Sequence, residues 1–242
     1  MILSTIDDLR KNIDGVLGVE GNRVVVLDEG ILKQKLIEDL VYTVVFNTRD
    51  EVRRSAAWLI RQAGASLGIK SASIQPLYKA MGRGDVSGFT VPAINIRGIT
   101  YHCAQAVFRA ARSIDAMAVI FEIARSEIGY TDQRPAEYTA VVTAAAIKAG
   151  YRGPLFLQGD HFQINAGKYR NDPTTELEAV KQLIREAVQG GFYNIDIDAS
   201  TLVDLSRDSL LAQQEDNYSI TADLTALIRN IEPAGITISI GG

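Results

Sequence analysis

The sequence predicts an α/β protein whose core is a parallel β-sheet. From about residue 88, five short apolar runs alternate with longer segments that carry apolar residues at three- and four-residue spacing. A strand, a crossover helix and a second strand in that order form a right-handed βαβ unit, so this alternation favours parallel pairing. The expected strands are 89–96, 117–124, 154–160, 192–198 and 236–240.

The number of strands leaves two architectures to compare. Five strands alone favour an open, doubly wound sheet. A (β/α)8 TIM barrel requires three more units, or about 90 further residues. The sequence stops at "ISIGG", directly after its fifth expected strand and with no helix to cover it. We therefore expect a TIM barrel of which this chain holds the first five strands.

The first part of the chain has a different pattern. It offers a short strand between helices, in the order helix 5–14, strand 23–29 and amphipathic helices near 31–45 and 49–65. We interpret it as an accessory helical cap or an oligomerisation element. The expected division is a mainly helical N-terminal extension, residues 1–75, and a barrel catalytic domain, residues 76–242, incomplete at its C-terminus.

Composition narrows the class of protein. The chain has 25 basic and 29 acidic residues, well interspersed, and this absence of a basic stripe argues against a nucleic-acid partner. The N-terminus does not resemble a signal peptide, and no apolar run reaches the roughly 20 residues that span a bilayer. Cys103 is the single cysteine, which excludes a disulfide framework. We expect a cytoplasmic protein without a membrane partner.

Common catalytic motifs are missing from the sequence. It contains no G-x-x-x-x-G-K-S/T phosphate loop, no G-x-G-x-x-G between a strand and a helix, and no G-x-S-x-G nucleophile elbow. Lys148 is expected on a helix and Lys168 lies well beyond the third strand, so neither is well placed to form a Schiff base.

Polar residues instead follow four of the five expected strands. Parallel barrels hold their active sites at the carboxyl ends of their strands. The residues at these positions are Asn95, then Glu122 with Arg125 and Ser126, then Asp160 with His161, then Asp196 with Asp198 and Ser200.

The Asp160–His161 pair is the strongest chemical candidate among them. An imidazole binds Zn²⁺ through one nitrogen, and a nearby carboxylate can move a proton to or from a substrate. A lone histidine is more often a packing or capping residue, so the pair taken alone is a weak signal. Its position at a strand end strengthens the chemical interpretation.

Four segments resemble, in order and spacing, the class II metal-dependent ketose-bisphosphate aldolases, which act on fructose or tagatose bisphosphate. They are "VPAINIRGITY", "GPLFLQGDHFQIN", "GFYNIDIDASTLVDLS" and "ITISIGG". The resemblance covers about residues 76–242. It implies a zinc-dependent, reversible aldol cleavage of fructose 1,6-bisphosphate, or of tagatose 1,6-bisphosphate, to dihydroxyacetone phosphate and glyceraldehyde 3-phosphate.

The resemblance also implies site residues and partners. His161 matches the first zinc ligand, Asp160 the aspartate that exchanges a proton with the substrate hydroxyl, and Asn95 a substrate-side asparagine. Asp198 and Ser200 match the I-D-G-S segment at the active-site edge. The implied cofactor is Zn²⁺ or another divalent cation, and the implied partners are a sugar bisphosphate and further copies of the chain, as a homo-dimer or tetramer.

The match has departures, and they leave alternatives open. His102 matches no ligand position, and Ala199 and Thr201 replace the usual residues around Ser200. Arg125 either contacts a substrate phosphate or forms a salt bridge with Glu122 or Glu127. The alternative functions are a catalytically silent barrel that serves as a binding or assembly module, and a sugar-phosphate isomerase or epimerase.

Overall fold

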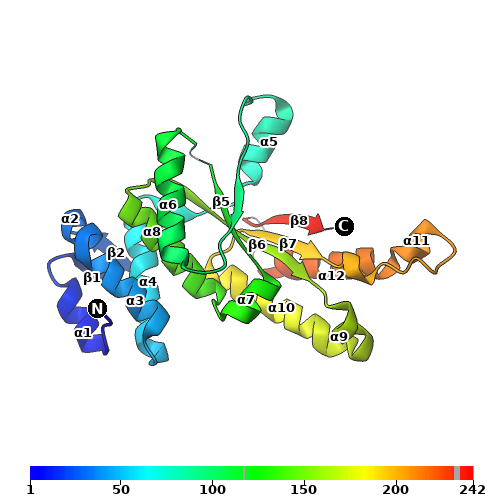
Figure 1. Ribbon diagram of the computed structural model, residues 1–242, viewed down its shortest axis with the longest axis horizontal. Helices are drawn as coiled ribbons and strands as arrows, with labels where there is room; N and C mark the ends of the chain where they lie inside the picture. Colours follow the sequence, from blue (N-terminus) through cyan, green and yellow to red (C-terminus); the bar gives the residue numbers. More distant parts are fainter. Residues whose placement is uncertain (117, 232–234, 242) are drawn as a thin grey trace.

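A computed structural model describes residues 1–116, 118–231 and 235–241 of the chain. Its centre is a parallel sheet with the strand order β4-β5-β6-β7-β8 (Figure 1). These strands are β4 (Ala93–Asn95), β5 (Ile120–Ala124), β6 (Gly153–Gln163), β7 (Asn194–Asp198) and β8 (Thr237–Gly241). A short strand, β3 (Ile69–Ser71), pairs in parallel with the beginning of β6. The predicted α/β class and parallel pairing are confirmed.

The predicted TIM barrel is wrong. A barrel of that type needs eight tilted strands, with the last one paired to the first. The described sheet has six strands, and β4 and β8 end its path without pairing with each other. The sheet is therefore open, with β4 and β8 as its two edges. The five expected strands and the four helices between them are present, but their number is too small to close the sheet.

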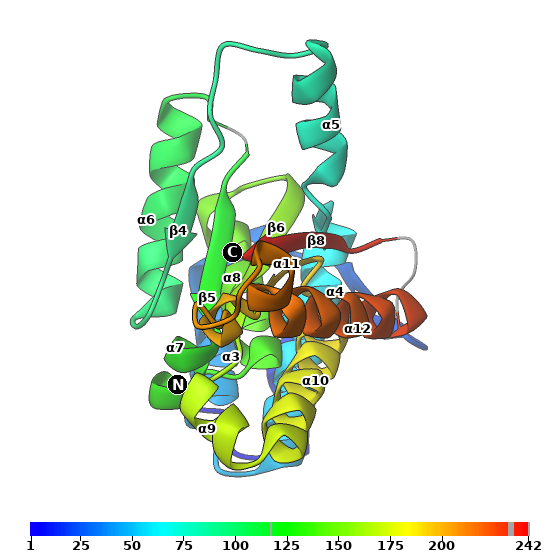
Figure 2. The same ribbon diagram turned by 90° about the vertical axis from the view of Figure 1, so that its right-hand side faces the viewer.

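Helices cover one face of this sheet (Figure 2). They are α6 (Thr100–Ser113), α8 (Pro135–Ala149), α10 (Pro173–Gly190) and α12 (Glu215–Ile231). On β5 the side chains alternate between faces: Phe121 and Ile123 are fully buried in the main core, whereas Ile120 belongs to a small second cluster. Glu122 shares the face of Ile120, so polar side chains gather on the face opposite the helices.

The N-terminal part packs on the same helical layer. It consists of α1 (Ile6–Ile13), a hairpin of β1 (Leu17–Glu20) and β2 (Arg23–Val26), α2 (Glu29–Ile31), the π-helix η1 (Leu32–Leu36), α3 (Ile37–Phe46) and α4 (Asp50–Ser66). Both α3 and α4 contact α8, and Leu40 and Ile60 are fully buried there. One hydrophobic core thus joins this region to the sheet.

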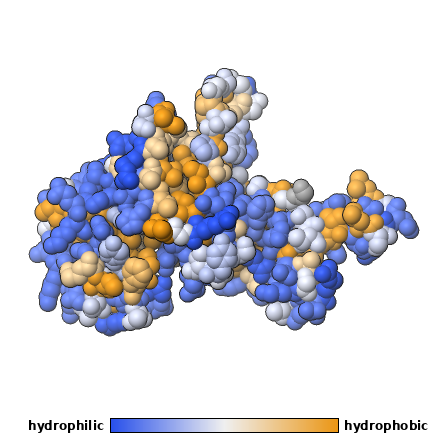
Figure 3. Space-filling model, in the orientation of Figure 1, coloured by the Kyte–Doolittle hydropathy of each residue, from blue (hydrophilic) through white to orange (hydrophobic). Residues whose placement is uncertain are grey.

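The remaining elements are short or peripheral. They are α5 (Gln75–Arg83), α7 (Arg125–Thr131), α9 (Ala166–Asn171), the 3-10 helix η2 (Ser200–Leu202) and α11 (Leu210–Gln213). In both ribbon views α5 stands away from the sheet. Apolar side chains lie on the surface of α11 (Figure 3), where Leu210 and Leu211 are exposed.

Among the helices that the structure describes, none combines the length and apolar character needed to cross a membrane. Met117, Glu232 and Pro233, which begin an expected strand and end an expected helix, lie outside the described residues.

Candidate active site

A β-bulge near the end of β6 brings two consecutive residues to one side of the sheet. The pairing with β7 shifts between Gly159 and Phe162, which leaves one extra residue on β6. His161 occupies this bulge with a φ of +42°, a left-handed conformation that is uncommon for any residue except glycine. Asp160 and His161 therefore do not point to opposite faces, as neighbours on a regular strand do.

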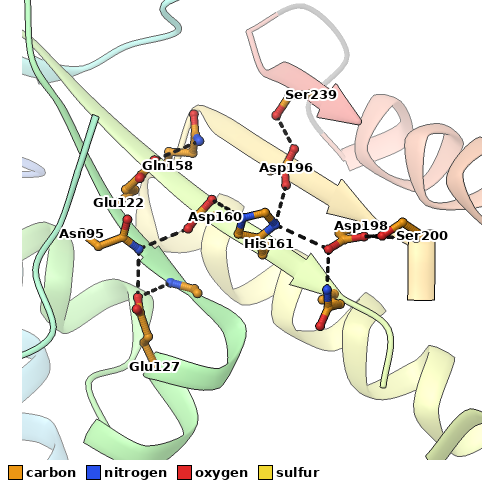
Figure 4. A network of polar contacts seen from close by, with 12 residues as sticks. Asn95, Glu122, Glu127, Gln158, Asp160, His161, Asp196, Asp198, Ser200 and Ser239 are labelled. Atoms are coloured by element: carbon orange, nitrogen blue, oxygen red, sulfur yellow. Dashed lines mark hydrogen bonds and ion pairs between the residues drawn. The ribbon is translucent and has the colours of Figure 1, made fainter. Parts of the chain in front are cut away.

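Three carboxylates surround the imidazole of His161 (Figure 4). Its Nε2 lies 3.6 Å from Oδ1 of Asp160, and its Nδ1 lies 3.6 Å from Oδ2 of Asp196 and 3.4 Å from Oδ2 of Asp198. Burial lowers the pKa of His161, but the three carboxylates outweigh it and raise that pKa above its ordinary value. The carboxylates are nearly buried, while the imidazole is exposed to solvent.

Asp196 and Asp198 lie on the same face of β7 because they are two residues apart on a strand. Burial raises the pKa of Asp196, although Ser239 on β8 donates a hydrogen bond of 2.6 Å to its Oδ1. Burial acts in the same direction on Asp198, but hydrogen bonds from Ser200 and Gln163 reverse the effect and lower its pKa. Asp198 is thus held as a carboxylate with both oxygens engaged.

Glu122 is a further acidic group on this face and comes from β5. Its Oε2 accepts a hydrogen bond of 3.1 Å from Nε2 of Gln158, the residue two positions before Asp160. Burial, followed by the nearby charge of Asp160, raises the pKa of Glu122 to about 7. A carboxyl group that titrates near neutral pH is suited to both donating and accepting a proton.

Asn95 links the site to β4, the strand next to β5. Its Nδ2 donates to Oδ2 of Asp160 at 3.1 Å and to Oε2 of Glu127 at 3.0 Å. Glu127 also accepts from the backbone N–H of Ala124 at 2.8 Å and pairs with Arg97 at 2.6 Å. The amide of Asn95 therefore fixes the orientation of the Asp160 carboxylate.

The guanidinium of Arg125 binds other groups of the protein. It pairs with Glu176 of α10 through two nitrogens and donates to the backbone oxygen of Gln163 at 2.6 Å. Arg125 does form a salt bridge, but its partner is Glu176 and not Glu122 or Glu127, the glutamates expected from the sequence. Arg125 still lines a pocket of about 380 Å³ beside His161, together with the exposed Lys168.

Sequence reasoning placed five of its six site residues in this network. Asn95, Asp160, His161, Asp198 and Ser200 converge, and Arg125 lies at the edge of the adjoining pocket. Asp196 and Glu122 were noticed as strand-end residues but were not assigned roles. Ser239 was missed, although its place in "ITISI" on a strand next to "NIDID" was a usable signal.

The donor set of Asp160, His161 and Asp196 fits a divalent cation. One ligand atom from each residue lies within 4.8 Å of the others. Imidazole together with carboxylates suits Zn²⁺ and Mn²⁺. The raised pKa values of Asp196 and Glu122 reflect acidic groups that are partly buried near other negative charges, and a cation would relieve that repulsion.

Comparisons with known proteins give little beyond this geometry. No family model matches the chain, and no curated protein matches it. A solved structure described as "Crystal structure of a probable tagatose 6 phosphate kinase from Sinorhizobium meliloti 1021" is similar, with 21% identity and a TM-score of 0.49. The likeness covers 64% of this chain and 39% of that chain, and it supports no conclusion about activity.

The predicted ketose-bisphosphate aldolase is corrected by these findings. The aldolase assignment depended on a closed barrel, and the sheet that the structure describes is open, with β4 and β8 at the two ends of its path. The two alternatives, a silent barrel module and a sugar-phosphate isomerase or epimerase, assumed the same barrel and lose their basis with it.

Proposed function

We propose that the chain is a metal-dependent enzyme that transfers protons to and from a small phosphorylated substrate at the carboxyl ends of β5, β6 and β7. The observation that carries this proposal is the convergence of the Asp160, His161 and Asp196 donor atoms within 4.8 Å. Glu122, whose pKa is raised to about 7, lies on the same face of the sheet and supplies the acid–base group.

The cation is held by Asp160, His161 and Asp196 in this proposal. When bound, it supplies Lewis-acid stabilisation of negative charge on a substrate oxygen. Asp198 accepts hydrogen bonds from Ser200 and Gln163, and its Oδ2 also faces Nδ1 of His161. Its role is to orient the imidazole, as carboxylates behind a metal-binding histidine commonly do.

Glu122 acts as the general acid and base. Its carboxyl is anchored by Gln158 and is near enough to the site for Asp160 and Asp196 to influence its pKa. At neutral pH both protonation states of Glu122 are populated, so it can accept a proton from the substrate and return one later in the cycle.

The adjoining pocket supports the choice of an anionic substrate. Lys168 is exposed at this pocket, and Arg125 lies beside it with its charge neutralised by Glu176. Among the described residues that line this pocket, Lys168 is therefore the cationic group that forms no ion pair, and a phosphate on the substrate would pair with it.

Metal titration tests the first half of the proposal. Chelator-treated protein should bind one equivalent of Zn²⁺ or Mn²⁺ by calorimetry, and His161→Gln and Asp196→Asn should each weaken binding by about tenfold or more. His102→Gln is the matched control, because this exposed histidine lies on α6 outside the site. Equal affinity in His161→Gln and His102→Gln would refute the assignment.

Isotope exchange tests the second half. The metal-loaded protein is incubated in D₂O with a panel of small phosphate monoesters, and deuterium entering a carbon position is detected by NMR. Glu122→Gln should abolish exchange while retaining the cation. Exchange at the wild-type rate in Glu122→Gln would remove Glu122 from the mechanism.

A further inference from the structure

A second polar pocket lies at the opposite end of the sheet from the candidate active site. Its volume is about 410 Å³, and it is bordered by α4, β3, α8, the end of α10 and the residues that follow α10. β3 pairs with Gly153–Leu155, the first residues of β6, whereas Asp160 and His161 stand near the other end of that strand. The pocket is therefore separate from the metal-binding residues.

Arg61 is an unpaired cation in this pocket. It is partly buried on α4, and it forms no hydrogen bond or ion pair with any residue that the structure describes. Burial lowers the pKa of Arg61, and no carboxylate contributes to this shift. Arg53 and Arg125, by contrast, pair with Glu137 and Glu176. Removing a guanidinium from water without a counter-charge is unfavourable, so this site favours an anion.

Two hydrogen-bond donors converge over Gly191. This glycine has a φ of +98°, and a Cβ built on it would lie 3.1 Å from Nη2 of Arg61 and 3.3 Å from Oγ of Ser71. A side chain here would crowd both groups, so glycine allows the guanidinium and the hydroxyl to approach the backbone at the same point. Thr139 also lines the pocket, and its buried Oγ1 has no hydrogen-bond partner among the described residues.

The described lining of the pocket carries positive charge and no negative charge. Its charged residues are Arg61 and the exposed Lys70, and the other polar ones are Gln62, Ser71, Thr139, Thr143, Gln189 and Tyr193. The planar guanidinium donates two parallel hydrogen bonds to a phosphate group, and an ammonium group nearby adds a mobile charge.

We propose that this pocket binds a phosphate group, free or as the monoester of a small molecule, between Arg61, Ser71 and Lys70. The inference is independent of the proposed enzymatic function, because none of these residues belongs to the metal-binding network. The volume of the pocket greatly exceeds the roughly 30 Å³ share of one water molecule, so an organic group attached to the phosphate can be accommodated.

Calorimetry on the full chain, after treatment with chelator, tests this site with two probes: inorganic phosphate and glycerol 3-phosphate. We expect one-to-one binding that weakens with salt. Arg61→Gln should weaken it by about tenfold or more. Arg54→Gln is the matched control on the same helix, because Arg54 is 74% exposed and paired with Asp50. The titrations are repeated in Lys168→Gln, which removes the cation proposed to pair with a phosphate in the pocket beside His161, and one-to-one binding that depends on Arg61 should remain in that background.

The outcomes are distinct. Absence of binding by both probes, or equal affinity in wild type and Arg61→Gln, would overturn the proposal. A tighter complex with glycerol 3-phosphate identifies an ester as the ligand, and equal affinities identify the free ion. If Arg61→Gln does not fold, Lys70→Gln tests the same pocket from its exposed rim, and about a threefold loss of affinity is expected. Unchanged binding in Lys70→Gln and Ser71→Ala would then refute the site.

Discussion

His161 and Asp198 face each other across neighbouring strands, with Nδ1 of the imidazole 3.4 Å from Oδ2 of the carboxylate. Hydrogen bonds from Ser200 and Gln163 fix the position of the carboxylate. The imidazole of His161 faces it because the backbone of His161 is left-handed at the bulge of β6. Conformational strain thus coincides with the residue on which the proposed chemistry depends, as is common at functional sites.

The left-handed backbone at His161 predicts that glycine is preferred to alanine there. The φ of +42° disfavours any residue with a Cβ, by roughly 1–2 kcal/mol. His161→Gly should therefore be more stable than His161→Ala by about 1 kcal/mol in urea unfolding with chelator present. His102 on α6 provides the opposite case, since His102→Gly should be about 1 kcal/mol less stable than His102→Ala. The same sign at both positions would contradict the observed backbone.

The pKa of Glu122 predicts a pH-dependent stability. Burial raises this pKa from 4.5 to about 7, so between these values the folded protein retains a proton that the unfolded chain releases. Stability therefore falls as pH rises through this window. Glu122→Gln lacks the titration, and its stability relative to wild type should increase from pH 4.5 to pH 7.5 by on the order of 2 kcal/mol. Parallel stability profiles of the two proteins in chelator would show that Glu122 is not perturbed in this way.

Much of the fold was predictable because each strand and helix of the βα units has its own local sequence pattern. Strands such as 192–198 and 236–240 are apolar runs bounded by helical periodicity, and the structure places β7 and β8 within a residue or two of them. The number of strands that close a sheet is not a local property. The expected closed barrel was wrong for this reason, because no local pattern sets the number of strands in a sheet.

The candidate site was likewise only partly predictable from the sequence. Strand ends identified Asn95, Asp160 and Asp198 because parallel strands present their carboxyl ends on one edge. The bulge that turns His161 toward Asp198 depends on the register between β6 and β7, which no pattern in the sequence specifies. The pairing of Arg125 with Glu176 is likewise a contact between residues 51 positions apart.

The ion pair of Arg125 with Glu176 predicts a structural role for this arginine. The side chain of Glu176 is 2% exposed, so its charge would be left buried without a counter-ion in Arg125→Ala. We expect a loss of about 3 kcal/mol in unfolding free energy. Arg54→Ala removes an exposed ion pair with Asp50 and should cost about 0.5 kcal/mol or less. Equal, small losses in both variants would instead favour a role for Arg125 toward the substrate.

Gly159 is the position where packing and the bulge are coupled most closely. A Cβ on this residue would lie 2.5 Å from Cζ of Phe162, a side chain that is fully buried. Gly159→Ala must therefore displace Phe162 and, with it, the backbone between them that carries Asp160 and His161. We expect a loss of about 2–3 kcal/mol in unfolding free energy.

The matched control for Gly159 is Gly82, which lies on α5 with open space around its Cα. Gly82→Ala should stabilise the protein by up to about 1 kcal/mol, because alanine is the better helix former. Titration of both variants with Zn²⁺ or Mn²⁺ then separates the effect on stability from the effect on cation binding. Gly159→Ala should also bind Zn²⁺ or Mn²⁺ more weakly, since its ligands sit on the displaced segment. A destabilised Gly159→Ala with wild-type affinity would show that the ligands do not depend on the geometry of the bulge.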